Sequence, residues 1–129
     1  MSLVRAGMTQ AERCRYVADL IEAHPENFDM NHLATSIAND DRSSDIEIQV
    51  EYGARPDLAE CGAVGCIAGW TLSVTPPSEC NDAAMWEHIA GPLLGLDPDD
   101  AVDLFFDFGL AAPDAAFLLR WHADELDRA

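Results

Sequence analysis

Apolar residues recur every three or four positions over most of the chain, a pattern typical of helices that bury one face. The first such stretch follows Thr9 and Glu12, which have the spacing of a capping box. His24 and Pro25 are expected to end this helix, since proline disfavours helical geometry at the residue before it. The predicted inward face consists of Cys14, Val17, Ala18 and Ile21.

Two shorter helices are predicted from the same spacing. Residues 30–37 carry apolar side chains on one face. Residues 81–90 carry another such face, with Asn81 as a capping residue. The Gly91-Pro92 pair is expected to kink or break this second helix, because proline lacks the amide hydrogen that the helical ladder requires.

The last third of the chain predicts two more helices. Asp97 and Pro98 mark the start of one, since a capping acid followed by a first-turn proline suits a helix N-terminus, and Gly109 is expected to end it. The final helix begins near Pro113, and its bulky residues are expected to face the core. The pattern therefore predicts a mostly α-helical single domain over residues 1–129, with five or six short helices. The residues expected to face inward in the final helix are Phe117, Leu118 and Trp121.

Residues 39–60 depart from the helical pattern and are expected to form an insertion of loop and strand. Within them, apolar residues alternate with acidic or amide residues over positions 46–52, which is typical of a strand with one apolar face. One strand cannot satisfy its own backbone hydrogen bonds, so it must pair in a hairpin, across a homodimer or with another protein. Its apolar face consists of Ile46, Ile48, Val50 and Tyr52.

Residues 61–72 are apolar on every side, which predicts a helix surrounded by the others. Small side chains recur in this segment every four residues, and such a stripe lets a neighbouring backbone approach closely. Glycine within a helix costs about 1 kcal/mol relative to alanine, so the two glycines of the stripe need a packing reason. The stripe consists of Cys61, Gly65, Gly69 and Ser73.

The same segment carries a motif that resembles a family of small phage and bacterial proteins. That family is marked by the pattern Cys-Gly-Thr-x-x-Cys-Ile-Ala-Gly-Trp, and Ala63 departs from it by standing where threonine is usual. The resemblance implies a phage or bacterial origin. It offers no catalytic residue, because it implies no established activity. The residues assigned to this structural motif are Cys61, Gly65, Cys66, Gly69 and Trp70.

The charge of the chain argues against some classes of function. Asp and Glu number 24 against 7 basic residues, for a formal charge of −17, and every basic residue is arginine. Nucleic acids and anionic membranes are bound through basic patches, so direct binding to either is not expected. An acidic surface fits simple solubility, and it also fits recognition of a basic partner. Nothing resembles a signal peptide, so a cytoplasmic location is expected, within a bacterial host if the protein is phage-encoded.

The cysteines give an alternative to a binding function. Cys61, Cys66 and Cys80 together with His88 or His32 have donor types that bind zinc or support thiol chemistry. The spacing between the first two is longer than in a zinc knuckle, and residues five apart point away from each other on a helix. Burial as small apolar side chains is the competing interpretation. No cofactor is therefore expected.

The acidic helix that begins at Asp97 is the most distinctive predicted surface. Hydrolase, metalloprotease and phosphate-binding motifs are absent from the sequence, so no enzymatic activity is expected. DNA mimicry is one version of an acidic binding surface, although one row of aspartates gives a charge every ~6 Å against one per ~1.7 Å in duplex DNA. We therefore expect a non-catalytic interaction protein, such as a phage accessory factor that binds a host or phage protein. The aspartates expected on this surface are Asp99, Asp100, Asp103 and Asp107.

Overall fold

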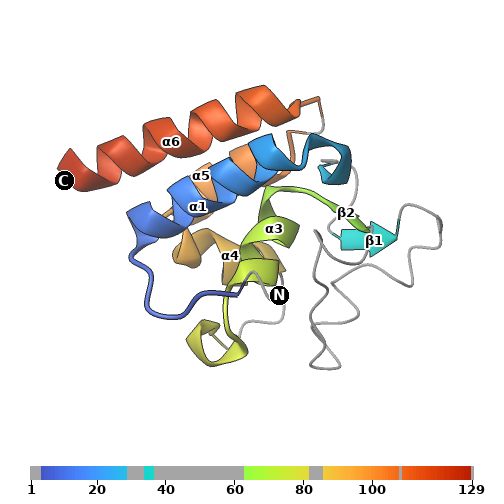
Figure 1. The fold of residues 1–129 in the computed structure, drawn as a ribbon. Helices are drawn as coiled ribbons and strands as arrows, with labels where there is room; N and C mark the ends of the chain where they lie inside the picture. The colour runs from blue at the N-terminus through green and yellow to red at the C-terminus, as the bar shows by residue number, and fades with distance from the viewer. Residues whose placement is uncertain (1–3, 29–33, 37–62, 82–85, 108, 129) are drawn as a thin grey trace.

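The computed structural model describes residues 4–28, 34–36, 63–81, 86–107 and 109–128, and these residues are mostly helical (Figure 1). The mostly α fold class predicted from the apolar periodicity is therefore confirmed. In this part of the chain, no helix has the length and apolar character needed to cross a membrane. The helical elements are α1 (Gln10–Ala23), η1 (Pro25–Asn27), α3 (Ile67–Val74), η3 (Pro77–Glu79), α4 (Trp86–Leu93), α5 (Pro98–Phe105) and α6 (Ala112–Arg128).

The first helix begins and ends where its sequence signals predict. Thr9 Oγ1 accepts a hydrogen bond from the Glu12 amide (3.1 Å), and Glu12 Oε1 accepts one from the Thr9 amide (2.8 Å). These bonds complete the capping box and lower the pKa of the Glu12 carboxyl. His24 caps the C-terminus, and its ring stacks on Trp70 of α3 with 6.1 Å between ring centroids.

Two three-residue strands stand where helix was predicted. β1 (Ala34–Ser36) and β2 (Ala63–Gly65) pair antiparallel, with Thr35 opposite Val64. The helix predicted over residues 30–37 is therefore wrong where it meets β1. A short apolar run fits a strand as well as a helix, and here pairing between distant segments overrides the local periodicity.

The central helix begins later than predicted. α3 starts at Ile67 with Cys66 as its N-cap, because β2 occupies the residues just before it. The stripe of small side chains is consequently divided, since Gly65 lies in β2 and Gly69 in α3. Cys61, its first member, lies outside the described residues.

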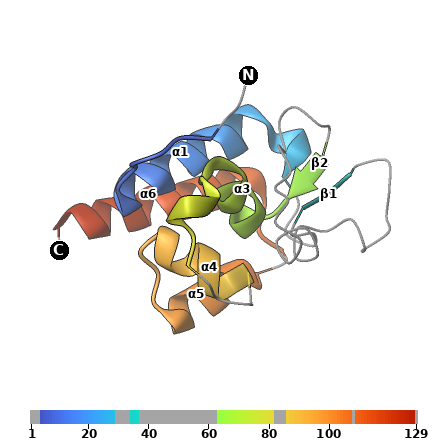
Figure 2. The same cartoon turned by 90° about the horizontal axis from the view of Figure 1, so that it is seen from below.

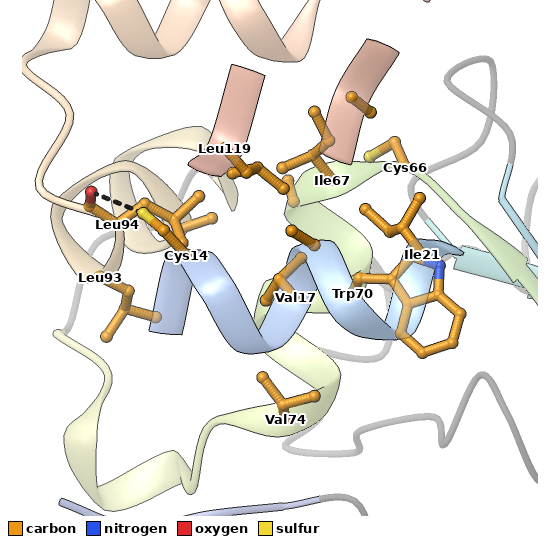
Figure 3. Packing of buried hydrophobic residues seen from close by; sticks show 14 of the residues in the cluster. Cys14, Val17, Ile21, Cys66, Ile67, Trp70, Val74, Leu93, Leu94 and Leu119 are labelled. Atoms are coloured by element: carbon orange, nitrogen blue, oxygen red, sulfur yellow. Dashed lines mark hydrogen bonds between the residues drawn. The ribbon is translucent and has the colours of Figure 1, made fainter. Parts of the chain in front are cut away.

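α3 lies within the hydrophobic core, and all of its residues are buried (Figure 3). Its Ile67 and Trp70 belong to the same buried cluster as Ile21 of α1 and Leu119 of α6. Hydroxyl groups inside this helix each donate to the carbonyl four residues earlier, at 2.7–2.8 Å, so their burial leaves them hydrogen-bonded. The buried hydroxyls belong to Thr71, Ser73 and Thr75.

α1 and α6 lie side by side and antiparallel (Figures 1 and 2). The face that α6 turns toward the core is small, because four of its five buried residues are alanine. Alanine side chains let two helix backbones approach closely, which suits the long contact with α1. The five buried residues are Ala112, Ala115, Ala116, Leu119 and Ala123.

The prediction that α6 buries its bulky residues is wrong. Phe117 is 66% exposed, Leu118 36% and Trp121 55%. These three residues lie on the opposite side of the helix from the alanine face. Side-chain bulk predicts the wrong face of α6, whereas the continuous three- and four-residue spacing of the alanines marks the buried face.

α4 includes Pro92 and stops at Leu93, so the break predicted at Gly91-Pro92 lies within a residue or two of the observed end of the helix. Pro92 lacks an amide hydrogen and so cannot bond to the carbonyl of His88. The side-chain amide of Asn81 donates to that carbonyl instead, at 2.9 Å. Gly95, two residues beyond the end of α4, has φ +72° and allows the Leu96 amide to bond back to the Gly91 carbonyl (3.0 Å).

Candidate functional site

A groove with a volume of about 340 Å³ lies between α5 and α6. Both helices contribute to it, together with Leu96 from the connection between α4 and α5. Apolar side chains and aspartates meet in this one depression, which we call the α5–α6 groove. Its lining comprises Leu96, Asp100, Asp103, Leu104, Asp107, Leu118, Trp121 and His122.

The sequence fixes how α5 presents its aspartates to the groove. Asp97 caps the helix by accepting a hydrogen bond from the Asp100 amide (2.8 Å), as predicted. Ala101 and Phe105 are buried on the core side of α5. Gly91 lets α4 approach closely, because a Cβ at that position would lie 3.1 Å from the Ala101 Cβ. With this face held against the core, Asp100 and its neighbours on the other side are exposed.

α6 is oriented by the contact on its opposite side. Burial of its alanine face against α1 leaves Leu118 and Trp121 turned toward the groove. His122 lines the groove and also contacts the backbone beyond the end of α4, where its Nε2 is 3.0 Å from the Leu94 carbonyl oxygen. A carbonyl oxygen only accepts, so Nε2 carries the proton of this bond.

The groove aspartates carry charge that the described arginines do not neutralise. Within the described residues, no arginine forms an ion pair with Asp100, Asp103 or Asp107. The five arginines that the structure describes contact other groups. Arg5 lies over the Tyr16 ring (4.0 Å), Arg13 pairs with Glu79 (2.8 Å), Arg15 with Asp124 and Asp127 (2.9 and 2.7 Å), Arg120 with Asp19 and Glu22 (2.8 and 2.6 Å), and Arg128 with Glu125.

The structure brings together three of the four aspartates that the sequence placed on one surface. Asp100 and Asp103 face the groove one turn apart on α5, and Asp107 joins them just after the helix ends. Asp99 is exposed but does not line the groove.

The second predicted interaction surface lies outside the described residues. The insertion over residues 39–60 and the strand over residues 46–52 both fall in this part of the chain, and the described residues give the strand no support. A contact with a partner or a second copy through this strand therefore stays a prediction. Its apolar residues were Ile46, Ile48, Val50 and Tyr52.

The described residues also give no support to a zinc site. Cys66 is buried at the N-terminus of α3, and Cys80 is half-buried with its Sγ 3.8 Å from the Pro76 carbonyl oxygen. His88 is exposed. Within the described ranges, no three His, Cys, Asp or Glu side chains gather in a way that could hold a metal ion.

Cys14 and His122 meet at one carbonyl but do not form a nucleophile and its base. The Cys14 thiol donates to the Leu94 carbonyl (3.4 Å), which is also the partner of His122. Burial raises the pKa of Cys14 to about 12, so the thiol stays protonated near neutral pH and is not a nucleophile. Both side chains instead satisfy a carbonyl at the C-terminal end of α4.

Other side chains serve the same end of α4. Arg13 Nη1 donates to the Leu93 carbonyl (3.0 Å), and Gln10 Nε2 donates to the Pro92 carbonyl (3.0 Å). The arginine charge also suits the negative end of the helix dipole. The polar cluster around α4 is thus explained by the fold, and the α5–α6 groove is the stronger candidate for function.

The apolar half of the groove was not predicted from the sequence. Leu118 and Trp121 were expected to face the core, and no role in binding was predicted for Leu96, Leu104 or His122. One signal was available: the alanine stripe already completes the buried face of α6. Bulky residues off that stripe had to be exposed.

Comparison with known proteins gives no relative. No protein-family model, no curated protein and no solved structure matches the chain. The resemblance of the motif around Cys61 and Trp70 to phage and bacterial proteins therefore stays a prediction.

Proposed function

We propose that this protein is a non-catalytic, acidic binding protein that recognises a basic protein segment at the α5–α6 groove. The observation that carries the proposal is the meeting of exposed bulky apolar side chains and unneutralised aspartates in one depression. Trp121 is 55% exposed there, beside Asp103 and Asp107. An exposed apolar patch rimmed by polar residues is typical of an interaction site.

Charge favours a basic partner over other ligands. The chain has a formal charge of −17, and the described arginines already pair within the molecule. A cationic segment would supply the charge that Asp100, Asp103 and Asp107 lack. Complementary charge raises association rates and excludes acidic competitors.

DNA mimicry is a weaker version of the same proposal. A phosphate backbone offers regular charge without large apolar side chains, whereas this groove has Leu104, Leu118 and Trp121 among its aspartates. A partner that normally binds phosphate backbones would gain little from contact with that apolar surface. The groove therefore favours a partner that inserts an apolar side chain as well as presenting charge.

Affinity capture tests the proposal. The tagged protein is incubated with a bacterial lysate, and bound proteins are eluted in rising salt and identified by mass spectrometry. Two groove variants are compared with wild type: Trp121→Ala, and Asp103→Asn combined with Asp107→Asn. Matched controls are Val102→Ala and Asp99→Asn, which remove an exposed apolar residue and a charge from α5 outside the groove.

The proposal expects a basic partner that both groove variants lose and both controls retain. Elution should shift to lower salt for the aspartate variant, because ionic contacts are screened by salt. Capture that is equal for wild type and both groove variants would show that the groove is not the binding surface.

A further inference from the structure

Resting on the proposed function, we infer that the groove receives an amphipathic helix of the partner. A bulky apolar residue of that helix enters between Leu118 and Trp121. Arginine or lysine side chains on its flank face Asp100 and Asp103 on α5 and Asp107 beyond it. The inference identifies the partner by its chemistry: a cationic helical segment with apolar anchors.

The apolar surface is longer than the groove itself. Leu118 and Trp121 line the cavity, and Phe117 extends the apolar face of α6 around the helix, with 66% of its surface exposed. Leu104 adds an apolar side chain from α5. A ligand that covers this surface must carry several apolar groups along its length, as one face of a helix does.

The spacing of the aspartates also favours a helix. Asp100 and Asp103 are one turn apart, which is roughly 4.5 Å along α5, and Asp107 lines the groove just beyond the end of that helix. Cationic residues three or four apart on a neighbouring helix repeat that spacing. Side chains on one face of an extended strand are about 6.8 Å apart and lose register with the row.

Other occupants fit the groove less well. A second copy of this chain would bring another strongly acidic surface, and the arginines described in it are held by its own carboxylates and by Tyr16. Duplex DNA would place phosphates beside the aspartates, which is repulsive. An extended segment could add to a sheet edge, but no residue of β1 or β2 lines the groove.

Fluorescence anisotropy with designed peptides tests the inference. The probe is a labelled, amphipathic peptide of about 18 residues, long enough to form a helix on binding. It carries leucine and tryptophan at i, i+3, i+4 and i+7 and arginine on the flanking positions. One comparison peptide has the same composition with the helical periodicity scrambled. A second keeps the charge and replaces the apolar anchors with alanine.

The periodic peptide is expected to bind at least about tenfold more tightly than either comparison peptide, since only it presents anchors and charge together. Trp121→Ala should weaken its binding about 30-fold, as a central hot-spot residue does. The double variant Asp103→Asn and Asp107→Asn should weaken it about tenfold at low salt and less at high salt. Val102→Ala and Asp99→Asn should change it less than about threefold.

The outcomes separate this inference from the proposed function. Equal binding of the scrambled peptide overturns the helical occupant, and so does failure of the probe while lysate capture still depends on the groove. In both cases the acidic binding function stands. Failure of both the probe and the capture overturns the two proposals together. Self-association that Trp121→Ala abolishes overturns the inference in favour of a second copy.

Discussion

The two sides of α6 differ in side-chain size and in burial. The side against α1 is built from alanines and Leu119, and its borders are closed by ion pairs of Arg15 and Arg120 with acids of the opposite helix. The side toward α5 carries Leu118 and Trp121, which are larger and yet exposed. The helix therefore buries its small residues and leaves its large ones at the surface.

Charge is distributed in the same unequal way. At the α1–α6 contact, arginine and carboxylate side chains neutralise one another across the interface. At the groove, Asp103 and Asp107 receive no arginine from the described residues. An interface that is complete within the molecule satisfies both its apolar area and its charge. The groove instead has exposed apolar side chains and aspartates without an arginine partner among the described residues, and the proposed binding function rests on these two features.

The largest expected effect tests this contrast at adjacent positions. Leu119→Ala should lower the free energy of unfolding by about 2–5 kcal/mol, because Leu119 is fully buried and its removal leaves a cavity. Leu118→Ala makes the same chemical change on the groove side and should cost less than about 1 kcal/mol. Urea unfolding followed by circular dichroism measures both. Equal losses would show that the groove side of α6 is packed like the core.

The same contrast separates features that the sequence predicts from features that depend on the packed fold. The capping residues Thr9 and Asp97 set the starts of α1 and α5 as predicted, because a cap depends on a few neighbouring residues. The inward face of α6 was mispredicted, because Phe117 and Trp121 have much larger apolar side chains than alanine. Which face is buried depends on how closely another helix approaches, and that is a property of the whole fold.

Non-local pairing explains the other mispredictions. Residues in β1 and β2 are far apart in sequence, so neither segment alone reveals that it will pair, and Cys66 becomes a cap only because β2 ends before it. For the site, the aspartates on α5 were identified from their spacing. Leu118 and Trp121 were not, since a groove between two helices exists only after both are packed.

The next effect concerns a charge that is buried within the fold. Arg13→Met should lower the free energy of unfolding by about 1.5–3 kcal/mol, because the Leu93 carbonyl and Glu79 each lose a charged donor. Methionine keeps most of the apolar volume, so the loss reports the polar contacts. Thermal and urea unfolding measure it. A change indistinguishable from that of Arg15→Met, whose ion pairs are exposed, would mean that the buried contacts contribute nothing extra.

A smaller effect is expected for the exposed border of the α1–α6 contact. Arg120→Met should cost about 0.2–1 kcal/mol at low salt and neutral pH, and less when salt screens the charges. The hydrogen bond from Arg120 lowers the pKa of Glu22. This stabilisation is therefore present above the ordinary pKa of a glutamate and is lost as the pH falls through the lowered value.

This pH dependence provides a test of the ion pair between Arg120 and Glu22. Urea unfolding of wild type and Arg120→Met is compared at neutral pH and in acid below the pKa of Glu22. The difference between the two proteins should be smaller in acid than at neutral pH, because the ion pair with Glu22 no longer contributes there. A difference that persists unchanged in acid would assign the effect of Arg120 to its other contacts, which are the ion pair with Asp19 and the packing of its side chain.

The smallest expected effect has the opposite sign. Asp103 has like charges one turn earlier on α5, at Asp99 and Asp100, and no described arginine pairs with it. Asp103→Asn should therefore raise the free energy of unfolding by about 0.2–0.5 kcal/mol. Asp97→Ala, on the same helix, should instead lower it by about 1 kcal/mol, because it removes the cap. The same Asp103→Asn protein should bind the cationic peptide more weakly. Gained stability with lost binding is the trade-off expected of a residue kept for its partner, and a loss of stability would mean that Asp103 serves the fold instead.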